Sequence, residues 1–382
     1  MLTTEEAARR LGVKVPTLYA YVSRGLLESH RDPNARGSLF DLADVEALAT
    51  RSRGGRQTST RLATITTAVT QLHQELGPLY RGRRATDLAA HASFEEVAEL
   101  LWQTGPAGRG DDWDAPDLGP CPLVHTFDRM RWALVVCGAT DPLRSDLRTA
   151  AVARAARRSA AALVAAVGDG PDDPNENDSI ATRLAARLTP SSGAVPADAV
   201  NAALVLLADH ELATSTMAVR VAASVRADPY DAFLAGLATL AGPLHGGASQ
   251  MAYELLVVAE RDGAARALND VLREQGRLPG FGHTIYKSGD PRFAALLALA
   301  EPLLRDEQRA VLHEVIALAA AHDVPLPNCD LALAALSWGT GMPPDTGRTL
   351  FAVARVAGWA AHYLEELNER PVRFRARAVY SV

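Results

Sequence analysis

The chain has 382 residues, of which 48% are hydrophobic and 22% charged, as in a globular protein of two or three domains with a large buried core. Only 5% are aromatic and alanine runs are frequent, which favours close helix packing over a β-sandwich. The net charge of −6 argues against a chain that coats nucleic acid throughout its length.

Cysteine usage and the start of the chain indicate a cytoplasmic protein. Cys121, Cys137 and Cys329 lack metal-ligand spacing, and such a sparse, odd set is typical of reduced thiols. The first residues, MLTTEEAARRLG, are acidic and amphipathic, unlike a signal peptide, and no apolar run reaches the length of a membrane span. We therefore expect no membrane partner.

The first 50 residues predict a small helical module. Helices are expected over Glu5–Leu11, with Thr3 or Thr4 as the N-cap, over Val15–Ser23, and over Leu42–Ala49. The stretch HRDPNARGSLF between the second and third helices has turn chemistry and reads as extended. Residues 51–60, RSRGGRQTST, lack apolar periodicity and are interpreted as a linker.

From Leu62 onward the pattern is helical, and no sustained β alternation or internal repeat is visible. Two polar segments rich in Gly, Pro and Asp, residues 105–120 and 168–178, are predicted to be surface loops. The fold class expected from the residues is therefore all-α.

Four short segments differ from ordinary helical sequence. They are ADHE (208–211), GPLHGG (242–247), PGFGH (279–283) with the following Lys287 and DPR (290–292), and PNCD (327–330).

These segments suit acid–base chemistry at a carbonyl. His245 and His283 each lie beside glycine, so that a ligand can approach the backbone next to an acid–base group. Asp290-Pro291 is a strong helix start that places Arg292 at the helix mouth, and Asp330 is expected at an element boundary. Two histidines, a carboxylate and arginines fit proton abstraction beside a carbonyl with a polyanionic substrate bound by arginine. Each feature alone is also common as a turn or cap residue.

No metal is expected, because metal-ligand spacing such as HExxH or CxxC is absent.

Taken in order, the four segments resemble the citrate synthase family. The resemblance covers residues 62–382 and includes YRGRRATDLAAHASFEEVAELLW, DPYDAFLAGLATLAGPLHGGA, LPGFGHTIYKSGDPR and FAVARVAGWAAHYLE. It implies an all-helical homodimer with a shared active site in a cleft between a large domain (61–245 and 331–382) and a small domain (246–330). The implied reaction condenses acetyl-CoA with oxaloacetate and hydrolyses the citryl thioester, with no cofactor.

The resemblance also implies roles for individual residues. Asp330 would be the base that removes a proton from the acyl methyl group, His245 would hydrogen-bond the thioester oxygen, and His283 would polarise and protonate the oxaloacetate carbonyl. The oxaloacetate carboxylates would be bound by His210, Arg292, Arg355 and, from the neighbouring subunit, Arg375. CoA would contact the backbone around Leu278, Gly280 and Gly282, together with Lys287.

The sequence departs from the family pattern at three places. Ala213 replaces a usual Asn, although Ser215 is retained and is expected to orient His245. Leu331 replaces an aromatic residue after the catalytic Asp, and Arg375-Ala376-Arg377 replaces Arg-Pro-Arg, while a literal Arg-Pro occurs earlier at Arg370-Pro371. These departures bear on the acyl-CoA preference and on the assignment of Arg375.

The segment LTTEEAARRLGVKVPTLYAYVSRGLL resembles the helix-turn-helix of MerR-like and excisionase-like domains, with HRDPNARGSLFDLADVEAL as the wing and following helix. In this reading the second helix buries Leu18 and presents DNA-contacting residues, and Arg31 and Arg36 on the wing meet phosphates. The predicted DNA contacts are Lys14, Thr17, Tyr21 and Arg24. An inert appendage or a dimerisation arm is the alternative.

Three functions remain open at this point. The first is citrate synthesis from acetyl-CoA, and the second is 2-methylcitrate synthesis from propionyl-CoA. The third is a DNA-binding regulator whose synthase body senses acyl-CoA or oxaloacetate.

Overall fold

A computed structural model shows two compact units, Met1–Thr66 and Thr67–Val382, which are described separately below. The residues it describes are 2–11, 13–23, 27, 29–31, 38–41, 44–45, 65–105, 113–168, 178–189, 196–242 and 245–375.

The first unit is a winged helix-turn-helix. Helices α1 (Thr4–Leu11) and α2 (Val15–Ser23) agree with the predicted helices to within one residue. Thr3 caps α1: its hydroxyl accepts from the Glu6 main-chain N–H, and the Glu6 carboxylate accepts from the Thr3 N–H in return. The expected linker and most of the expected third helix lie outside the described residues, although Asp44 and Val45 are helical.

A small antiparallel sheet forms the wing. Its strands β1 (Leu2–Thr3), β2 (His30–Arg31) and β3 (Ser38–Phe40) lie in the order β1-β3-β2, with Leu2 opposite Phe40 and His30 opposite Leu39. The sheet and both helices enclose one core, made of Ala7, Ala8, Leu11, Leu18, Leu27, Phe40 and Val45. The burial of Leu18 is as predicted.

The second unit begins with strands rather than helix, so the expectation of a helical pattern from Leu62 is wrong here. Strands β4 (Thr70–His73), β5 (Gly77–Tyr80) and β6 (Arg83–Arg84) form an antiparallel sheet in chain order. Gly77 and Gly82 both have positive φ, a backbone conformation that does not occur within a right-handed helix. They allow the tight connections between the strands. The strands are too short for an alternating pattern to stand out in the sequence.

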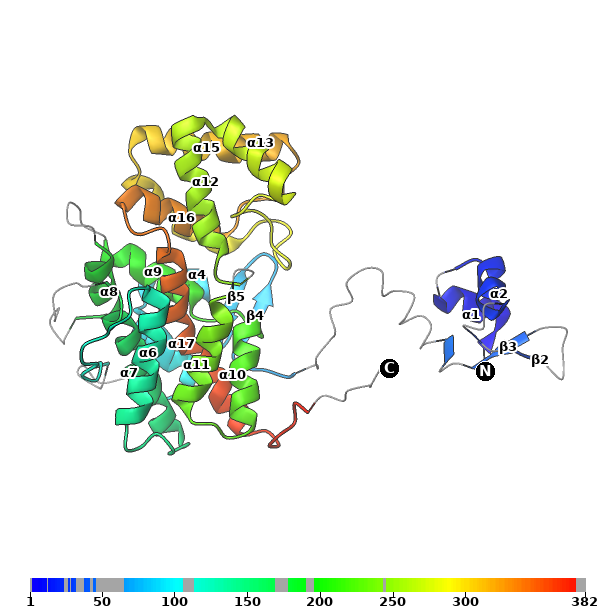
Figure 1. Cartoon of the computed structure of the whole chain (residues 1–382), viewed down its shortest axis with the longest axis horizontal. Coiled ribbons are helices and arrows are strands. Elements are labelled where there is room, and N and C mark those ends of the chain that lie inside the picture. The colour runs from blue at the N-terminus through cyan, green and yellow to red at the C-terminus, as the bar shows by residue number, and fades with distance from the viewer. Residues whose placement is uncertain are drawn as a thin grey trace. The chain divides into compact units, whose positions relative to one another are not determined.

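The regular elements in the remaining described part of this unit are mainly helices (Figure 1). Its helices are α4 (Ala85–His91), α5 (Phe94–Trp102), α6 (Thr126–Thr140), α7 (Thr149–Ala165), α8 (Ile180–Leu188), α9 (Ala197–Leu207), α10 (Thr214–Ser224), α11 (Pro229–Leu240), α12 (Ala248–Asp262), α13 (Ala264–Gln275), α14 (Pro291–Ala300), α15 (Asp306–Ala321), α16 (Cys329–Thr340) and α17 (Thr346–Leu367), with a 3-10 turn η2 (Glu301–Leu303) after α14.

Two hydrophobic cores organise these helices. The larger surrounds α17, which is buried along most of its 22 residues and packs against α5, α7, α9, α10 and α11. The smaller lies among α12, α13, α15 and α16, the helices at the top of the body in Figure 1. The proposed division into a large and a small domain stays a prediction.

The described parts of the two predicted loops, residues 105 and 113–120 of the first and residues 168 and 178 of the second, contain no helix or strand. Cys121, Cys137 and Cys329 are free thiols. Among the described residues, no helix combines the length and apolar character that crossing a membrane requires.

Because Leu18 is fully buried in the small core of the first unit, Leu18→Ala should destabilise that unit by about 2–5 kcal/mol. We expect thermolysin to cut within residues 1–66 of this variant, while the main calorimetric transition of residues 67–382 keeps its midpoint. Tyr19→Ala, at a side chain that is 46% exposed one residue away, is the matched control and should change little. Equal resistance of both variants to thermolysin would contradict the assigned core.

Candidate active site

Two buried guanidinium groups lie at the centre of the site. Arg292 and Arg355 are each only 3% exposed. Asp290 caps α14 and forms a bidentate ion pair with Arg292, at 3.0 Å (Nε–Oδ1) and 2.9 Å (Nη2–Oδ2). The predicted helix start at Asp290-Pro291 is thus confirmed. Arg355 differs from Arg292, because its Nε and Nη1 have no hydrogen-bond partner among the residues that the structure describes.

His283 is held as a neutral hydrogen-bond donor. The main-chain N–H groups of Ile285 and Tyr286 donate to its Nδ1 at 3.1 and 3.3 Å. Backbone amides only donate, so Nδ1 carries no proton and Nε2 must carry it. Burial, reinforced by the positive charge of Arg292, lowers the pKa of His283 to about 4. Near neutral pH its Nε2–H is therefore available to a ligand oxygen.

The tautomer of His245 is also fixed by a main-chain amide, but here the amide donates to Nε2 instead of Nδ1. The Ser215 N–H donates to His245 Nε2 at 3.3 Å, and the Ser215 hydroxyl lies 2.9 Å from the same atom. Trp359 Nε1 donates in turn to the Ser215 hydroxyl at 3.4 Å. This leaves the proton on Nδ1, while burial and the charge of Arg355 lower the pKa of His245. The expectation that Ser215 orients His245 is confirmed.

His210 packs against a tyrosine that the sequence analysis missed. The His210 Nε2 lies 3.1 Å from the Tyr286 hydroxyl, and the Tyr286 ring stacks on His283 with centroids 4.5 Å apart. The Arg292 guanidinium lies over the same tyrosine ring at 5.4 Å. Burial and the charges of Arg292 and Arg355 hold the pKa of His210 well below its usual value. Tyr286 therefore connects His210, His283 and Arg292.

Asp330 lies in the first turn of α16, at the element boundary predicted for it. The side chain of Asn328, the N-cap, accepts from the Asp330 N–H at 2.9 Å and donates to the Gly282 carbonyl at 2.7 Å. The Asn328 N–H also donates to the Gly280 carbonyl at 2.9 Å. These hydrogen bonds connect the turn that contains His283 to the start of the helix that contains Asp330.

Gly280 shows why glycine is required in this turn. It has φ 81°, and a Cβ there would lie 2.9 Å from Leu331 Cβ. Leu331 itself is fully buried in the smaller core.

The electrostatics join these groups into one site. The charge of Arg355 acts on His210, His245 and Asp330, and that of Arg292 acts on His210, His283 and Asp330. Burial raises the pKa of Asp330 to about 6, against the opposing influence of the two arginines. A carboxyl with such a pKa, under the same two arginines as imidazoles of lowered pKa, is typical of a proton-transfer site.

The other predicted site residues are placed less distinctively. Leu278 is buried in the smaller core, Gly282 has φ 76°, and the exposed Lys287 donates from Nζ to the His283 carbonyl at 3.0 Å. Arg375 is exposed and is the last described residue. Ala213, the departure from Asn, is the N-cap of α10 and offers no side-chain acceptor to its first turn.

In the helix-turn-helix, Lys14 and Thr17 are exposed as predicted. Tyr21 is only half-exposed and packs against the core of the unit, whereas Tyr19 is the exposed aromatic residue of α2. Arg24 and Arg36 lie outside the described residues, as does the side chain of Arg31.

Comparison with known proteins decides the family. The description "Citrate synthase, C-terminal domain" matches residues 117–377. The chain belongs to the citrate synthase family. It is a citrate synthase-type enzyme, and residues 1–53 match a helix-turn-helix domain, so both resemblances seen in the sequence are confirmed.

Similar proteins include both citrate and 2-methylcitrate synthases. The chain is 30% identical to citrate synthase 2 of Bacillus subtilis, over 78% of this chain and 88% of that protein. It is 28% identical to 2-methylcitrate synthase 1 of Corynebacterium glutamicum, over 79% and 89%.

The fold matches solved citrate synthases. A ternary complex of the Thermoplasma acidophilum citrate synthase with carboxymethyl coenzyme A and oxaloacetate aligns with a TM-score of 0.71 at 24% identity, covering 86% of this chain and 96% of that one. The all-helical citrate synthase fold is thereby confirmed.

Tyr286→Phe would remove the contact to His210 but keep the ring between His283 and Arg292. One neutral hydrogen bond contributes about 1 kcal/mol, so kcat/KM for the 2-oxo acid should fall roughly fivefold. Tyr286→Leu, which also removes the ring, should cost more. Equal kinetics for the wild type and the Leu variant would show that Tyr286 does not organise the two histidines.

Proposed function

We propose that the enzyme condenses acetyl-CoA with oxaloacetate and hydrolyses the resulting citryl thioester to citrate and CoA. The observation that carries this proposal is a carboxyl of raised pKa, Asp330, which shares the influence of Arg292 and Arg355 with two imidazoles whose neutral tautomers are set by main-chain amides. These are the groups required to form an enol from a thioester and to direct it to a ketone.

The first step is removal of a proton from the acyl methyl group by the Asp330 carboxylate. A methyl group beside a thioester is a very weak acid, so its deprotonation needs a hydrogen-bond donor at the thioester oxygen as negative charge develops there. Nδ1–H of His245 is that donor, because Nε2 is engaged by Ser215. Burial of both groups strengthens the interaction.

The second step forms the carbon–carbon bond. The enol carbon attacks the ketone carbon of oxaloacetate, and the ketone oxygen takes the proton carried on Nε2 of His283. Water then cleaves the citryl thioester, releasing CoA as the thiol. All of this chemistry is supplied by side chains and water, so the proposal includes no cofactor.

Two arginines and a neutral histidine of the site bind the dicarboxylate. His210, Arg292 and Arg355 lie together, and the free Nε–H and Nη1–H of Arg355 suit a carboxylate. The family resemblance assigns a further contact to Arg375 of a neighbouring subunit, so the proposal includes a homodimer. It assigns CoA to the backbone around Leu278–Gly282, near Lys287. A cytoplasmic location is part of the same proposal.

Propionyl-CoA is the alternative acyl donor, favoured by the similarity to a 2-methylcitrate synthase. One methylene in an apolar pocket is worth only about 1–3 kcal/mol, so activity with both thioesters is expected. Thiol release from acetyl-CoA and from propionyl-CoA, each with and without oxaloacetate, ranks the two substrates.

The pKa of Asp330 predicts how activity depends on pH. The deprotonated carboxylate is the active form, so kcat/KM should rise about tenfold between pH 5 and pH 7, with a midpoint near 6. Asp330→Ala should abolish thiol release while oxaloacetate binding persists. Asp231→Asn, which removes another carboxyl of raised pKa on α11, is the control and should leave the profile unchanged. Near-normal turnover in Asp330→Ala would remove Asp330 from the role of base.

A second function, DNA binding, is supported by the match of residues 1–53 to a helix-turn-helix domain and by a wing sheet that shares one hydrophobic core with α2. We propose that α2 enters the major groove, as recognition helices do. Lys14 precedes α2 with an exposed side chain and would meet a phosphate. A chain that binds DNA but releases no thiol from either acyl-CoA would be a regulator rather than an enzyme.

Lys14→Ala should lower the slope of log K against log salt by about one for a mixed pool of duplex DNA, as expected for the loss of one phosphate contact. Fluorescence anisotropy across a salt series measures this slope, and thiol release should be unaffected. The control is Glu5→Gln, an exposed charge change on α1. An unchanged slope in Lys14→Ala would contradict the proposed orientation of α2.

A further inference from the structure

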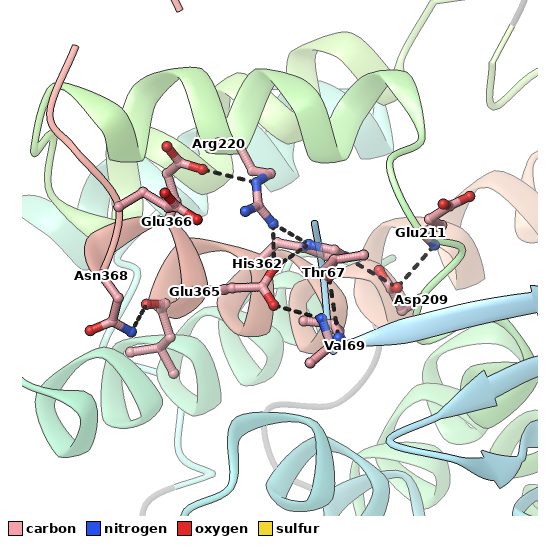
Figure 2. A network of polar contacts seen from close by, with 12 residues as sticks. Thr67, Val69, Asp209, Glu211, Arg220, His362, Glu365, Glu366 and Asn368 are labelled. Atoms are coloured by element: carbon pink, nitrogen blue, oxygen red, sulfur yellow. Dashed lines mark hydrogen bonds and ion pairs between the residues drawn. The ribbon is translucent and has the colours of Figure 1, made fainter. Parts of the chain in front are cut away.

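A buried chain of charged side chains lies behind the site (Figure 2). Four of its members, Asp209, Arg220, His362 and Glu366, are fully buried. It begins at Asp209, next to His210, and leads through His362 and Arg220 to Glu365 and Glu366. Removing this many charges from water costs desolvation free energy, which favours a role for the network beyond packing.

The Asp209 carboxylate is held from two sides. Its Oδ2 accepts from the Glu211 main-chain N–H at 3.0 Å and lies 3.3 Å from His362 Nε2. Glu211 has φ 54°, the left-handed conformation that ends the turn. The contact with Glu211 therefore fixes the backbone on both sides of His210.

Arg220 determines which ring nitrogen of His362 carries the proton. The Arg220 Nη1 lies 2.8 Å from His362 Nδ1, and a guanidinium only donates, so this nitrogen accepts. The proton of a neutral His362 is then on Nε2, where it points to Asp209. The charge of Arg220 is itself balanced by ion pairs with Glu365 and Glu366. His362 thus acts as a fixed donor to Asp209.

One face of α17 carries both His362, a member of this buried charged network, and Arg355. Arg355, Gly358 and His362 are spaced three and four residues apart, so they line one side of the helix. Gly358 donates its N–H to the Ala208 carbonyl at 3.0 Å, and a Cβ at Gly358 would lie 2.2 Å from Asp209 Oδ1. Glycine is therefore required for α17 to approach Asp209 this closely.

Asp209 and Arg355 influence each other without bonding. Burial lowers the pKa of Arg355 and the charge of Asp209 opposes this, yet no hydrogen bond or ion pair joins the two side chains. Within the part of the chain that the structure describes, Nε and Nη1 of Arg355 have no hydrogen-bond partner. Arg292, by contrast, is paired directly with Asp290.

We propose that Asp209 is a positioning residue for the carboxylate-binding end of the site. Its charge stabilises the buried Arg355, while His362 and the Glu211 N–H hold its carboxylate away from the guanidinium. The N–H groups of Arg355 are thereby kept free for a carboxylate of the 2-oxo dicarboxylate. This inference rests on the proposed function, because it takes oxaloacetate as the ligand of Arg355.

Asp209→Asn tests the charge with little change of shape. Without the charge of Asp209, the buried Arg355 guanidinium loses the interaction that keeps it in its binding position, so the Kd and KM for oxaloacetate should each rise about tenfold. The kcat and the KM for acyl-CoA should change by less than about threefold. Kd is measured by isothermal titration of the full-length protein with oxaloacetate alone, and KM by thiol release.

His362 variants test whether the carboxylate must be restrained. In His362→Gln the side-chain amide accepts from Arg220 and donates to Asp209, so oxaloacetate affinity should stay near that of the wild type. His362→Phe removes both contacts and frees Asp209 to pair with Arg355, so affinity should fall as in Asp209→Asn. Equal affinity in the Gln and Phe variants would contradict the restraint.

Asp141→Asn is the matched control for simple loss of a buried carboxylate. Asp141 is 4% exposed and binds Arg154 and Tyr230. This variant should lose thermal stability with no change in oxaloacetate Kd. If Asp209→Asn behaves the same way, Asp209 is only structural and the inference is overturned. A wild type that binds oxaloacetate but releases no thiol would instead contradict the proposed catalysis and leave the comparison of Kd values valid.

Discussion

The buried charge of Arg355 is the constraint on which the site depends. A guanidinium removed from water is stable only with compensating negative charge, yet a substrate-binding guanidinium must keep N–H groups free. The structure meets both demands by separating them. Asp209 supplies charge from a position fixed by His362 and the Glu211 N–H, and Nε and Nη1 of Arg355 have no hydrogen-bond partner among the described residues. The long buried helix α17 carries Arg355 and His362 and so sets their spacing.

The same arrangement keeps the histidines neutral. Positive charge adds to burial in lowering the pKa values of His210, through Arg292 and Arg355, and of His283, through Arg292. Main-chain amides then select the tautomer of His283, as the Ser215 N–H does for His245. A site whose two buried cations suit the proposed dianion therefore also provides neutral hydrogen-bond donors for developing negative charge. Raising the pKa of Asp330 by burial completes the acid–base set.

Much of this arrangement is predictable from the amino-acid sequence, because turn residues carry strong local signals. Asp290-Pro291 predicts a cap and Asn328 precedes an apolar helix, so these local signals alone place Arg292 and Asp330 at helix starts. Tyr286 and Asp209 were missed as site residues, since their contacts join segments far apart in the chain. The sheet over residues 70–84 was missed because its strands span only two to four residues. The spacing of Arg355, Gly358 and His362 predicts that they share one face of a helix. It does not predict that Asp209 contacts this face.

The central claim is that Asp330 removes a proton from the acyl methyl group with the help of His245. The most direct measurement is exchange of the acetyl-CoA methyl protons with deuterated water, followed by NMR, in the presence of a dicarboxylate that resembles oxaloacetate but lacks its ketone. The account predicts exchange in the wild-type enzyme and none in Asp330→Asn. Exchange that persists in Asp330→Asn at the wild-type rate would contradict it.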